Sequence, residues 1–211
     1  MYNYGGINRV RAQPLPPLSP LPPASSPYYV ASWSETGKVA IRDVRPLIES
    51  LDVPGYTIDK NRTNAATYTT DKHGRAEGFA MDWAAGPTAE GSAPSSALRL
   101  LTGDIHSKIY LTKSTPSGFM TEPNAYVSHT SSVEDIQWSP HEATIFASCS
   151  ADQSIRIWDV RHKARKNVFT VSPAHESDVN VISWNKNTSY LLLSGGDEGG
   201  IKVWDFRSLN G

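Results

Sequence analysis

A constant offset of 46 residues runs through the second half of the chain and limits the folds that this sequence can adopt. The residues that recur at this offset, without a gap, are His129 as His175, Val133 as Val179, Ile136 as Ile182, Trp138 as Trp184, Ser148 as Ser194 and Trp158-Asp159 as Trp204-Asp205. Within each unit apolar residues alternate with polar ones or form short runs, which is typical of short antiparallel strands. The sequence therefore predicts a β-repeat protein.

The offset is close to the period of WD-repeat blades, which are four-stranded sheets of about 40–45 residues. Resemblance to such a blade implies a buried hydrogen-bond chain of a His, a Ser or Thr, a turn Asp and a Trp, which fixes the strand register. This network comprises His129, Ser148, Asp152 and Trp158 in one unit, and His175, Ser194 and Trp204 in the next. Glu198 stands at the Asp position of the later unit, and we expect its longer side chain to fit poorly. We interpret the histidines as structural, in preference to metal ligands or general bases.

Two weaker units precede these. In residues 73–128, the stretches 79–83 and 100–104 align with the first two strands of the later units. Thr112 stands at the Trp position of this degenerate unit and His106 at the Asp position. The interval 84–96, rich in Ala, Gly, Pro and Ser, is expected to be an enlarged surface loop.

The first unit covers residues 1–44, with its inner strand at 7–11 and Arg42 at the Trp position, and residues 45–72 are assigned to an outer strand and a linker. A Pro-rich run at 14–27 interrupts this unit and must loop out, because proline cannot donate to a strand ladder. Its overlapping PxxP spacings leave two interpretations open. We favour a disordered insertion, and the alternative is a ligand for an aromatic groove.

These units, with the later ones at 129–174 and 175–211, nearly exhaust the 211 residues. WD-repeat propellers commonly close with seven blades, within a range of about four to eight. The sequence predicts an all-β, incomplete WD-repeat β-propeller with about four blades of a seven-bladed ring, the last blade truncated. Because ring closure removes exposed edges, we expect a fragment that is unstable alone.

Composition narrows the functional classes. The 20 basic and 21 acidic side chains balance, so direct binding to nucleic acid is not expected. We find no signal-peptide pattern and no apolar run long enough for a membrane helix. The sequence has no Gly-rich phosphate loop and no paired Cys or His at metal spacing, and Cys149 lies on a predicted inner-blade strand. The prediction is a non-catalytic protein-binding scaffold without cofactor or metal, not an enzyme.

Longer motifs resemble the glutamate-rich WD-repeat protein family. They are GINRVR at 6–11, WSETGKV at 33–39, SSVEDIQWSP at 131–140, FASCSAD at 146–152, IRIWD at 155–159, DVNVISW at 178–184, LLSGGD at 192–197 and KVWD at 202–205. The resemblance covers nearly the whole chain apart from the two insertions. It implies a chaperone for a newly made, basic large-subunit ribosomal protein in ribosome biogenesis, acting in the nucleus or nucleolus. Histone binding, which the resemblance attributes to animal relatives, is the alternative.

In WD blades the positions three and five residues after the structural His, and the one before the turn Asp, contact partners. Ten such positions are Glu35, Glu77, Phe79, Ile105, Ser132, Glu134, Ala151, Asp178, Asn180 and Asp197, of which five are acidic and none is basic. The predicted partner-binding set is Glu35, Glu77, Glu134, Asp178, Asn180 and Asp197. An acidic face would steer a strongly basic protein toward it. The alternative explanation is that exposed turns are commonly rich in Asp and Glu.

A further alternative function comes from the two WDxR patterns at 158–161 and 204–207. They resemble those of WD-repeat substrate receptors for cullin ubiquitin ligases, in which Arg161 and Arg207 would bind the ligase adaptor. Such an arginine also occurs in propellers that use it only to pair with a neighbouring strand. The basic cluster of Arg161, Lys163, Arg165 and Lys166 is compatible with an RNA contact or with a solvated loop between blades.

Overall fold

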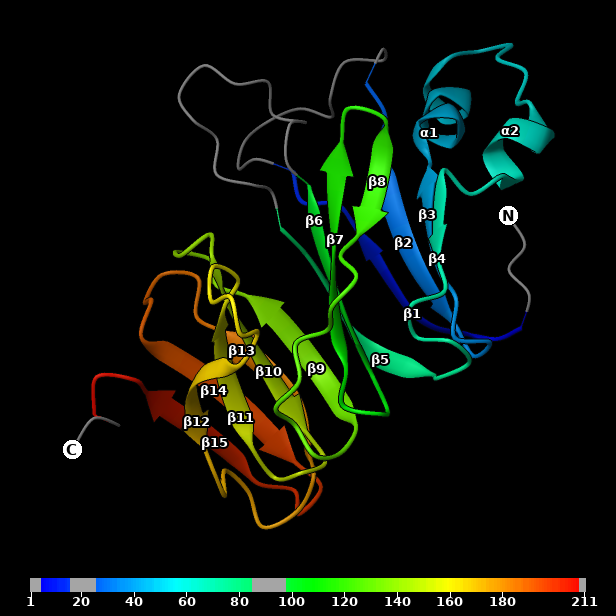
Figure 1. Cartoon of the computed structure of the whole chain (residues 1–211). Helices are drawn as coiled ribbons and strands as arrows, with labels where there is room; N and C mark the ends of the chain where they lie inside the picture. The colour runs from blue at the N-terminus through cyan, green and yellow to red at the C-terminus, as the bar shows by residue number, and fades with distance from the viewer. Residues whose placement is uncertain (1–4, 16–25, 85–97, 209–211) are drawn as a thin grey trace.

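Each repeat unit folds into one antiparallel sheet, and the four sheets are the blades of a β-propeller (Figure 1). The structure is a computed structural model, and it describes residues 5–15, 26–84 and 98–208. Blades 1 to 3 each have four strands in up-and-down order, and the described residues of blade 4 form three. The predicted all-β architecture with about four propeller blades is confirmed.

The strands follow each other from the inner to the outer edge of each blade. Blade 1 contains β1 (Ile7–Ala12), β2 (Tyr29–Ser34), β3 (Val39–Asp43) and β4 (Tyr68–Thr70), and blade 2 contains β5 (Gly78–Ala84), β6 (Arg99–Asp104), β7 (Ile109–Thr115) and β8 (Gly118–Thr121). Blade 3 contains β9 (Val133–Trp138), β10 (Ile145–Ser150), β11 (Ile155–Asp159) and β12 (Asn167–Val171), and blade 4 contains β13 (Val179–Trp184), β14 (Leu191–Gly196) and β15 (Ile201–Asp205).

Two short helices, which the repeat pattern did not indicate, lie between β3 and β4. They are α1 (Arg45–Asp52), which has Pro46 in its first turn, and α2 (Lys60–Asn64). Neither helix is long and apolar enough to span a lipid bilayer. Most of the Pro-rich run at 14–27 and of the predicted loop at 84–96 lies outside the described residues, so both interpretations stay predictions.

The hydrogen-bond network of blade 3 joins the segment before β9 to β10, to the turn after β10 and to β11. The indole N–H of Trp158 donates to Ser148 Oγ over 2.8 Å. Ser148 Oγ lies 2.7 Å from His129 Nε2, and His129 Nδ1 lies 2.9 Å from Asp152 Oδ2. Ser148 and Trp158 are fully buried and His129 is nearly so. Loss of one of these side chains would therefore leave a buried polar group with neither a hydrogen-bond partner nor access to water. The chain therefore fixes the strand register of the blade.

Burial and hydrogen bonding set the protonation states of His129 and Asp152 in this network. Burial lowers the pKa of His129, so the ring is neutral. Burial alone would raise the pKa of Asp152, but hydrogen bonds from His129, Ser154 and the Thr130 N–H outweigh it and hold that pKa well below its usual range. An ionised carboxylate can only accept, so the proton of the ring lies on His129 Nδ1. Nε2 is then an acceptor, and the Ser148 hydroxyl donates to it.

Blade 4 repeats this chain with a glutamate in place of the aspartate. His175 Nδ1 hydrogen-bonds to Glu198, His175 Nε2 lies 2.7 Å from Ser194 Oγ, and the Trp204 indole donates to Ser194 over 2.8 Å. The expectation that Glu198 fits poorly is therefore wrong. Glycines provide the space: a Cβ at Gly196 would lie 2.7 Å from His175 Nδ1, and one at Gly200 would lie 2.8 Å from a Glu198 oxygen.

Blade 2 contains a buried hydrogen-bond network that the sequence pattern did not reveal. His73 Nδ1 lies 2.7 Å from Asp104 Oδ2, and His73 Nε2 lies 2.8 Å from Thr102 Oγ1, with all three side chains buried. The repeat had placed the acidic partner at His106. The structure places it two residues earlier, at Asp104. Thr112, at the Trp position, contacts Thr121 Oγ1 over 2.8 Å instead of reaching Thr102.

In blade 1 an arginine takes the place of the indole. Arg42 Nη1 donates to Ser32 Oγ over 3.0 Å, as Trp158 Nε1 does to Ser148 in blade 3. Both side chains of the blade 1 pair are buried. The serine on the second strand therefore accepts from the third strand in blades 1, 3 and 4, whichever residue donates.

Apolar clusters and backbone hydrogen bonds hold the blades to each other. Each of the three clusters joins two successive blades: Trp33 packs with Met81, Leu111 with Trp138, and Ile155 with Trp184. On the inner strands, Asp82 Oδ2 accepts from the Trp138 N–H over 2.8 Å, and Gln137 Oε1 accepts from the Trp184 N–H over 2.5 Å. Asp82 and Gln137 each precede the tryptophan of their own strand, so one position repeatedly binds the next blade.

Ser148→Ala should destabilise the chain more than Ser194→Ala. The first change leaves buried His129 and Trp158 without a hydrogen-bond partner and should cost about 2–3 kcal/mol. The second should cost about 1–2 kcal/mol, because buried His175 also loses its partner, but Trp204 is only half-buried and its indole N–H can bind water instead. Urea unfolding of both variants measures the difference. Equal losses would contradict a stronger network in blade 3.

Asp82 gives a pH-dependent prediction, since burial raises the pKa of this carboxyl to about 6. A raised pKa means that the folded state favours the protonated acid, so this contribution to stability is lost as pH rises from about 4 through 6. Asp82→Asn should therefore stabilise the chain at pH 7.5 by about 1–3 kcal/mol and much less at pH 4.5. Thermal melting of both proteins across this range tests it, and a pH-independent difference would refute the assignment.

Candidate partner-binding rim

The same backbone hydrogen bond recurs at one end of every blade. The turn between the second and third strands donates to the segment that enters the inner strand: Glu35 N to Gly6 O over 2.9 Å, Ile105 N to Glu77 O over 3.1 Å, Ala151 N to Ser132 O over 3.0 Å and Asp197 N to Asp178 O over 3.0 Å. We call this end of the propeller, formed by those turns and entry segments, the turn rim. Of the predicted partner-binding residues, Glu35, Glu77, Asp178 and Asp197 lie on the turn rim, and Glu134 and Asn180 are the second residues of the adjoining strands β9 and β13.

The six side chains differ in exposure and in their contacts. Glu35, Asn180 and Asp197 are exposed, whereas Glu77, Glu134 and Asp178 are half-buried. Asn180 Nδ2 donates to Asp197, which fixes both side chains on blade 4. Asn8 Nδ2 donates to Glu77 over 3.3 Å and ties blade 1 to blade 2. All four blades thus contribute to the rim, and these two hydrogen bonds hold rim side chains in place.

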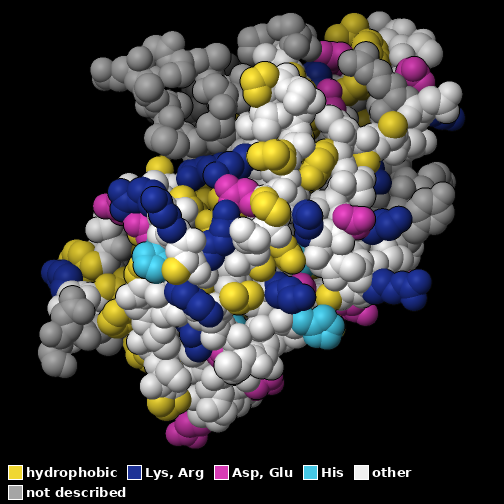
Figure 2. Space-filling view, in the orientation of Figure 1, with side chains coloured by type: hydrophobic (Ala, Val, Ile, Leu, Met, Phe, Trp, Pro, Cys, Tyr) yellow, Lys and Arg dark blue, Asp and Glu magenta, His cyan; other side chains and the backbone are white. Residues whose placement is uncertain are grey.

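The charge of the turn rim is uneven. On blades 1 and 2 the exposed basic residues Lys38, Lys72, Arg75 and Lys108 lie on the same turns as the acidic ones. The turns of blade 4, at 172–178 and 196–200, carry acidic residues and no Lys or Arg. In Figure 2 acidic side chains appear at the lower tip, where Figure 1 places the turns of blades 3 and 4. The acidic surface is therefore concentrated on these two blades.

Two acidic residues of blade 4, Glu176 and Glu198, add to the predicted set. Both are exposed. Hydrogen bonds from the Ser177 hydroxyl and from His175 lower the pKa of Glu198 to about 2, so this side chain is ionised at neutral pH. The prediction missed both because it sampled only three positions in each blade.

The two WDxR arginines lie at the opposite rim, after the third strands of blades 3 and 4. Arg161 forms a two-pronged ion pair with Asp159 of its own motif, at 3.0 and 2.6 Å, and Arg207 forms the same pair with Asp205. Arg207 also lies over the Tyr190 ring, 3.5 Å from its centroid. Each arginine thus pairs within its motif, not with a neighbouring strand. Binding of a ligase adaptor by these exposed side chains stays a prediction.

The basic cluster is partly used within the fold. Arg165 hydrogen-bonds to Glu122, its guanidinium lies over the Tyr126 ring, and Lys166 Nζ donates to the Val127 carbonyl over 2.6 Å. These contacts tie the loop between β11 and β12 to the segment that links blades 2 and 3. Part of the positive charge is therefore neutralised, which favours the structural interpretation of this loop.

Within the described residues, no three or more His, Cys, Asp or Glu side chains are grouped so as to hold a metal ion. Cys149 is fully buried on β10, and burial raises the pKa of its thiol well above the usual value. A buried protonated thiol is a poor nucleophile. Cys149 is therefore a packing residue.

Comparisons with known proteins agree with the repeat architecture. The family model described as WD domain, G-beta repeat, matches residues 121–159 and 165–205. Ribosome assembly protein rrb1 of Schizosaccharomyces pombe is 42% identical over 168 residues, which are 80% of this chain and 32% of that protein. Glutamate-rich WD repeat-containing protein 1 of Dictyostelium discoideum is 40% identical over 157 residues, which are 74% of this chain and 28% of that protein. The chain thus spans about a third of the length of these relatives.

A solved structure shows the same fold at low sequence identity. A chain in the structure of ctPRC2 in complex with H3K27me3 and H3K27M matches with a TM-score of 0.67 and 20% identity, over 94% of this chain and 37% of that one. At this identity the match supports the architecture alone. Together with the family-model match, it shows that the chain has a WD-repeat β-propeller fold, and the curated relatives show that the chain is similar to glutamate-rich WD-repeat proteins, as its sequence motifs indicated.

Proposed function

We propose that the chain is a non-catalytic scaffold that binds a strongly basic protein during ribosome biogenesis. The observation that carries this proposal is the 42% identity with a ribosome assembly protein. The proposed contact surface is the turn rim of blades 3 and 4, around Glu134, Asp178, Asn180 and Asp197. A nuclear or nucleolar location belongs to the same proposal.

The charge of this surface supports a basic partner. The turns of blade 4 present Glu176, Asp178, Asp197 and Glu198 and contain no Lys or Arg, and Lys202 of β15 donates from Nζ to the Ala174 carbonyl of the first turn. Like charges held on rigid turns create a local negative potential, which speeds encounter with a cationic partner and repels nucleic acid. The β-sheet below, fixed by His175 and Ser194, keeps the turns preorganised, so binding orders few side chains.

Free ribosomal proteins and histones both match this chemistry, because both are strongly basic. The relationship to a ribosome assembly protein favours a newly made large-subunit ribosomal protein as the cargo. The function is that of a chaperone: it covers basic surface until the cargo reaches RNA. A histone is the alternative cargo, and a panel of purified partners separates the two.

Reversing two rim charges should weaken binding to the basic cargo. Glu134→Lys with Asp178→Lys should lower the affinity for basic ribosomal proteins about tenfold at low salt, and less at high salt, where the attraction is screened. Pull-downs and titrations at two salt concentrations, against purified large-subunit proteins and core histones, measure this.

The matched control is Asp52→Lys with Glu142→Lys. This variant changes the net charge by the same amount, but at the end of α1 and in the loop between β9 and β10, on the opposite rim. Its affinity should stay close to that of the wild-type chain. An equal loss in both variants would mean that only overall charge matters, and no loss in the rim variant would end the proposal. Tighter binding to histones than to any ribosomal protein would select the alternative.

A further inference from the structure

A basic surface lies where the outer parts of blades 2 and 3 meet. The segment 160–166, which connects β11 to β12, contains four Lys or Arg residues, and the sequence from 160 to 175 has no Asp or Glu. In Figure 2 dark blue side chains gather over this part of blade 3, with few magenta ones among them. We call this surface the basic flank, and its cations are Arg99, Lys113, Arg161, Lys163, Arg165 and Lys166.

Blade 2 contributes two of these cations from neighbouring strands. Arg99 of β6 lies opposite Lys113 of β7 in the strand register. The Arg99 side chain is buried, and its guanidinium lies over the Trp138 ring of β9, 4.3 Å from the centroid. The Lys113 side chain is 43% exposed and pairs with Glu122. Blade 2 therefore adds one positive charge below the surface and one on it.

The cations of the basic flank outnumber its carboxylates. Glu122 binds both Lys113 and Arg165, one from each blade. Burial alone would raise the pKa of Glu122, but its bonds to these two side chains outweigh burial and lower it, so this carboxylate is ionised. Asp159 is paired with Arg161. Three positive charges are in excess, because the six cations share this surface with only three carboxylates, Glu122, Glu142 and Asp159.

The charge of the basic flank exceeds what the fold uses. The corresponding connection in blade 2 is the short turn at 116–117 between β7 and β8, which has no charged residue. Lys166 donates to the Val127 carbonyl, a bond that fixes the loop but leaves the charge uncompensated. Lys163 is exposed. The contacts within blade 3 therefore hold the loop in place and leave its positive charge available to a partner.

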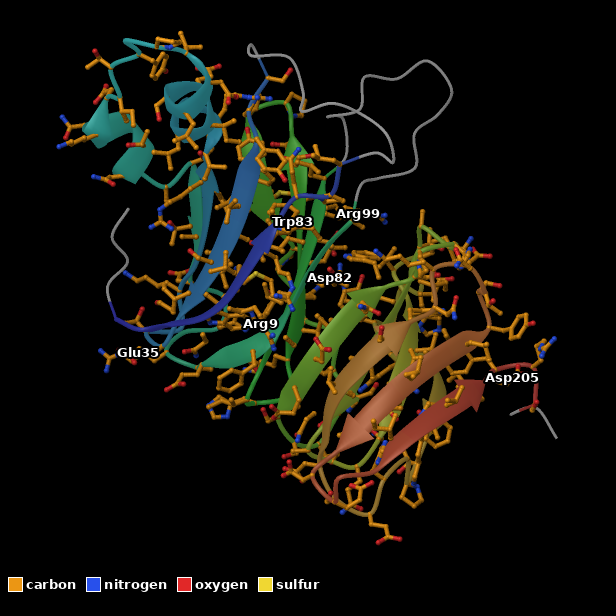
Figure 3. The ribbon with its side chains drawn as sticks, turned by 180° about the vertical axis from the view of Figure 1, so that it is seen from behind. Arg9, Glu35, Asp82, Trp83, Arg99 and Asp205 are labelled. Carbon is orange, nitrogen blue, oxygen red and sulfur yellow. The ribbon has the colours of Figure 1, made fainter. Side chains whose placement is uncertain are left out.

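The basic flank and the acidic turns lie at different ends of blade 3. The segment 160–166 follows β11, on the opposite rim, whereas the turn rim is formed by the turns that precede β11. Figure 3 shows the same separation on blades 1 and 2, where Glu35 lies at the turn rim and Arg99 lies toward the other end. The nearly equal totals of acidic and basic residues thus conceal two surfaces of opposite charge.

The side chains of the basic flank match a phosphate backbone better than an acidic protein. The exposed residues of the segment 160–166 include no large apolar side chain and are Arg161, His162, Lys163, Ala164 and Lys166. A protein interface usually has an apolar centre. Lys and Arg contacts to phosphates need none, because release of counterions from the nucleic acid supplies the free energy.

We propose that the basic flank binds the phosphate backbone of RNA, without regard to base sequence. The choice of RNA over DNA rests on the proposed role in ribosome biogenesis, whereas the choice of a phosphate backbone rests on the charge and composition of the flank. Because the acidic turns of blades 3 and 4 lie at the other rim, RNA on the flank leaves them free for the basic cargo.

Fluorescence anisotropy of a labelled single-stranded RNA of mixed sequence, titrated with the whole chain at several salt concentrations, tests the proposal. The wild-type chain should bind at low salt and lose affinity steeply as salt rises. Lys113→Gln with Lys163→Gln should weaken binding about tenfold at low salt and reduce the slope of log affinity against log salt by about 0.7 for each charge removed. Lys113→Arg with Lys163→Arg should bind as the wild type does. Circular dichroism spectra that match the wild type exclude unfolding.

The matched control is Lys72→Gln with Lys108→Gln, which removes the same charge from exposed residues of the turn rim. Its RNA affinity should equal that of the wild-type chain. A wild-type chain that does not bind RNA at low salt would overturn the proposal, as would equal losses in the flank and control variants. Tighter binding of poly-glutamate or of duplex DNA than of RNA would also overturn it. The Lys113→Gln, Lys163→Gln chain keeps every acidic residue of the turn rim, so its unchanged binding to basic ribosomal proteins separates this result from the proposed function.

Discussion

The hydrogen bond from the third strand to the serine of the second strand, present in blades 1, 3 and 4, is the contact on which the architecture depends most. In blade 3 this bond joins Trp158 to Ser148, and His129 extends it to Asp152 in the turn. A shift of one residue between strands would turn these polar groups away from their partners and bury them unpaired. Each blade is therefore fixed in one register, and the turns at its end are fixed with it.

Register then determines both the packing between blades and the surface. Once β9, β10 and β11 are aligned, Ile155 and Ile157 face blade 4 and Gln137 reaches the Trp184 backbone. The same alignment brings the entry segment next to the turn of every blade, so rim side chains from distant parts of the sequence share one surface. The proposed binding of a basic protein uses the turns that this one constraint holds in place.

The sequence predicted most of blades 3 and 4 and less of blades 1 and 2. An ungapped offset reveals a network directly, whereas the insertion in blade 2 breaks the offset and hid His73 and Asp104. Glu198 looked unsuitable because side-chain length was considered alone, although Gly196 and Gly200, which make room for it, were visible. The helices α1 and α2 have no counterpart in the other units, so a repeat could not reveal them. The acidic rim was predicted in part, but the basic residues of blades 1 and 2 on the same turns were not.

Hydrogen exchange at the indole N–H of Trp158, followed by NMR, tests the central claim most directly. If this proton is held by Ser148 inside a register-locked blade, it exchanges only when the whole blade unfolds, at the rate of the slowest backbone amides of β10. Trp204, half-buried in blade 4, should exchange faster. An indole proton of Trp158 that exchanges as quickly as those of exposed loops would contradict the account.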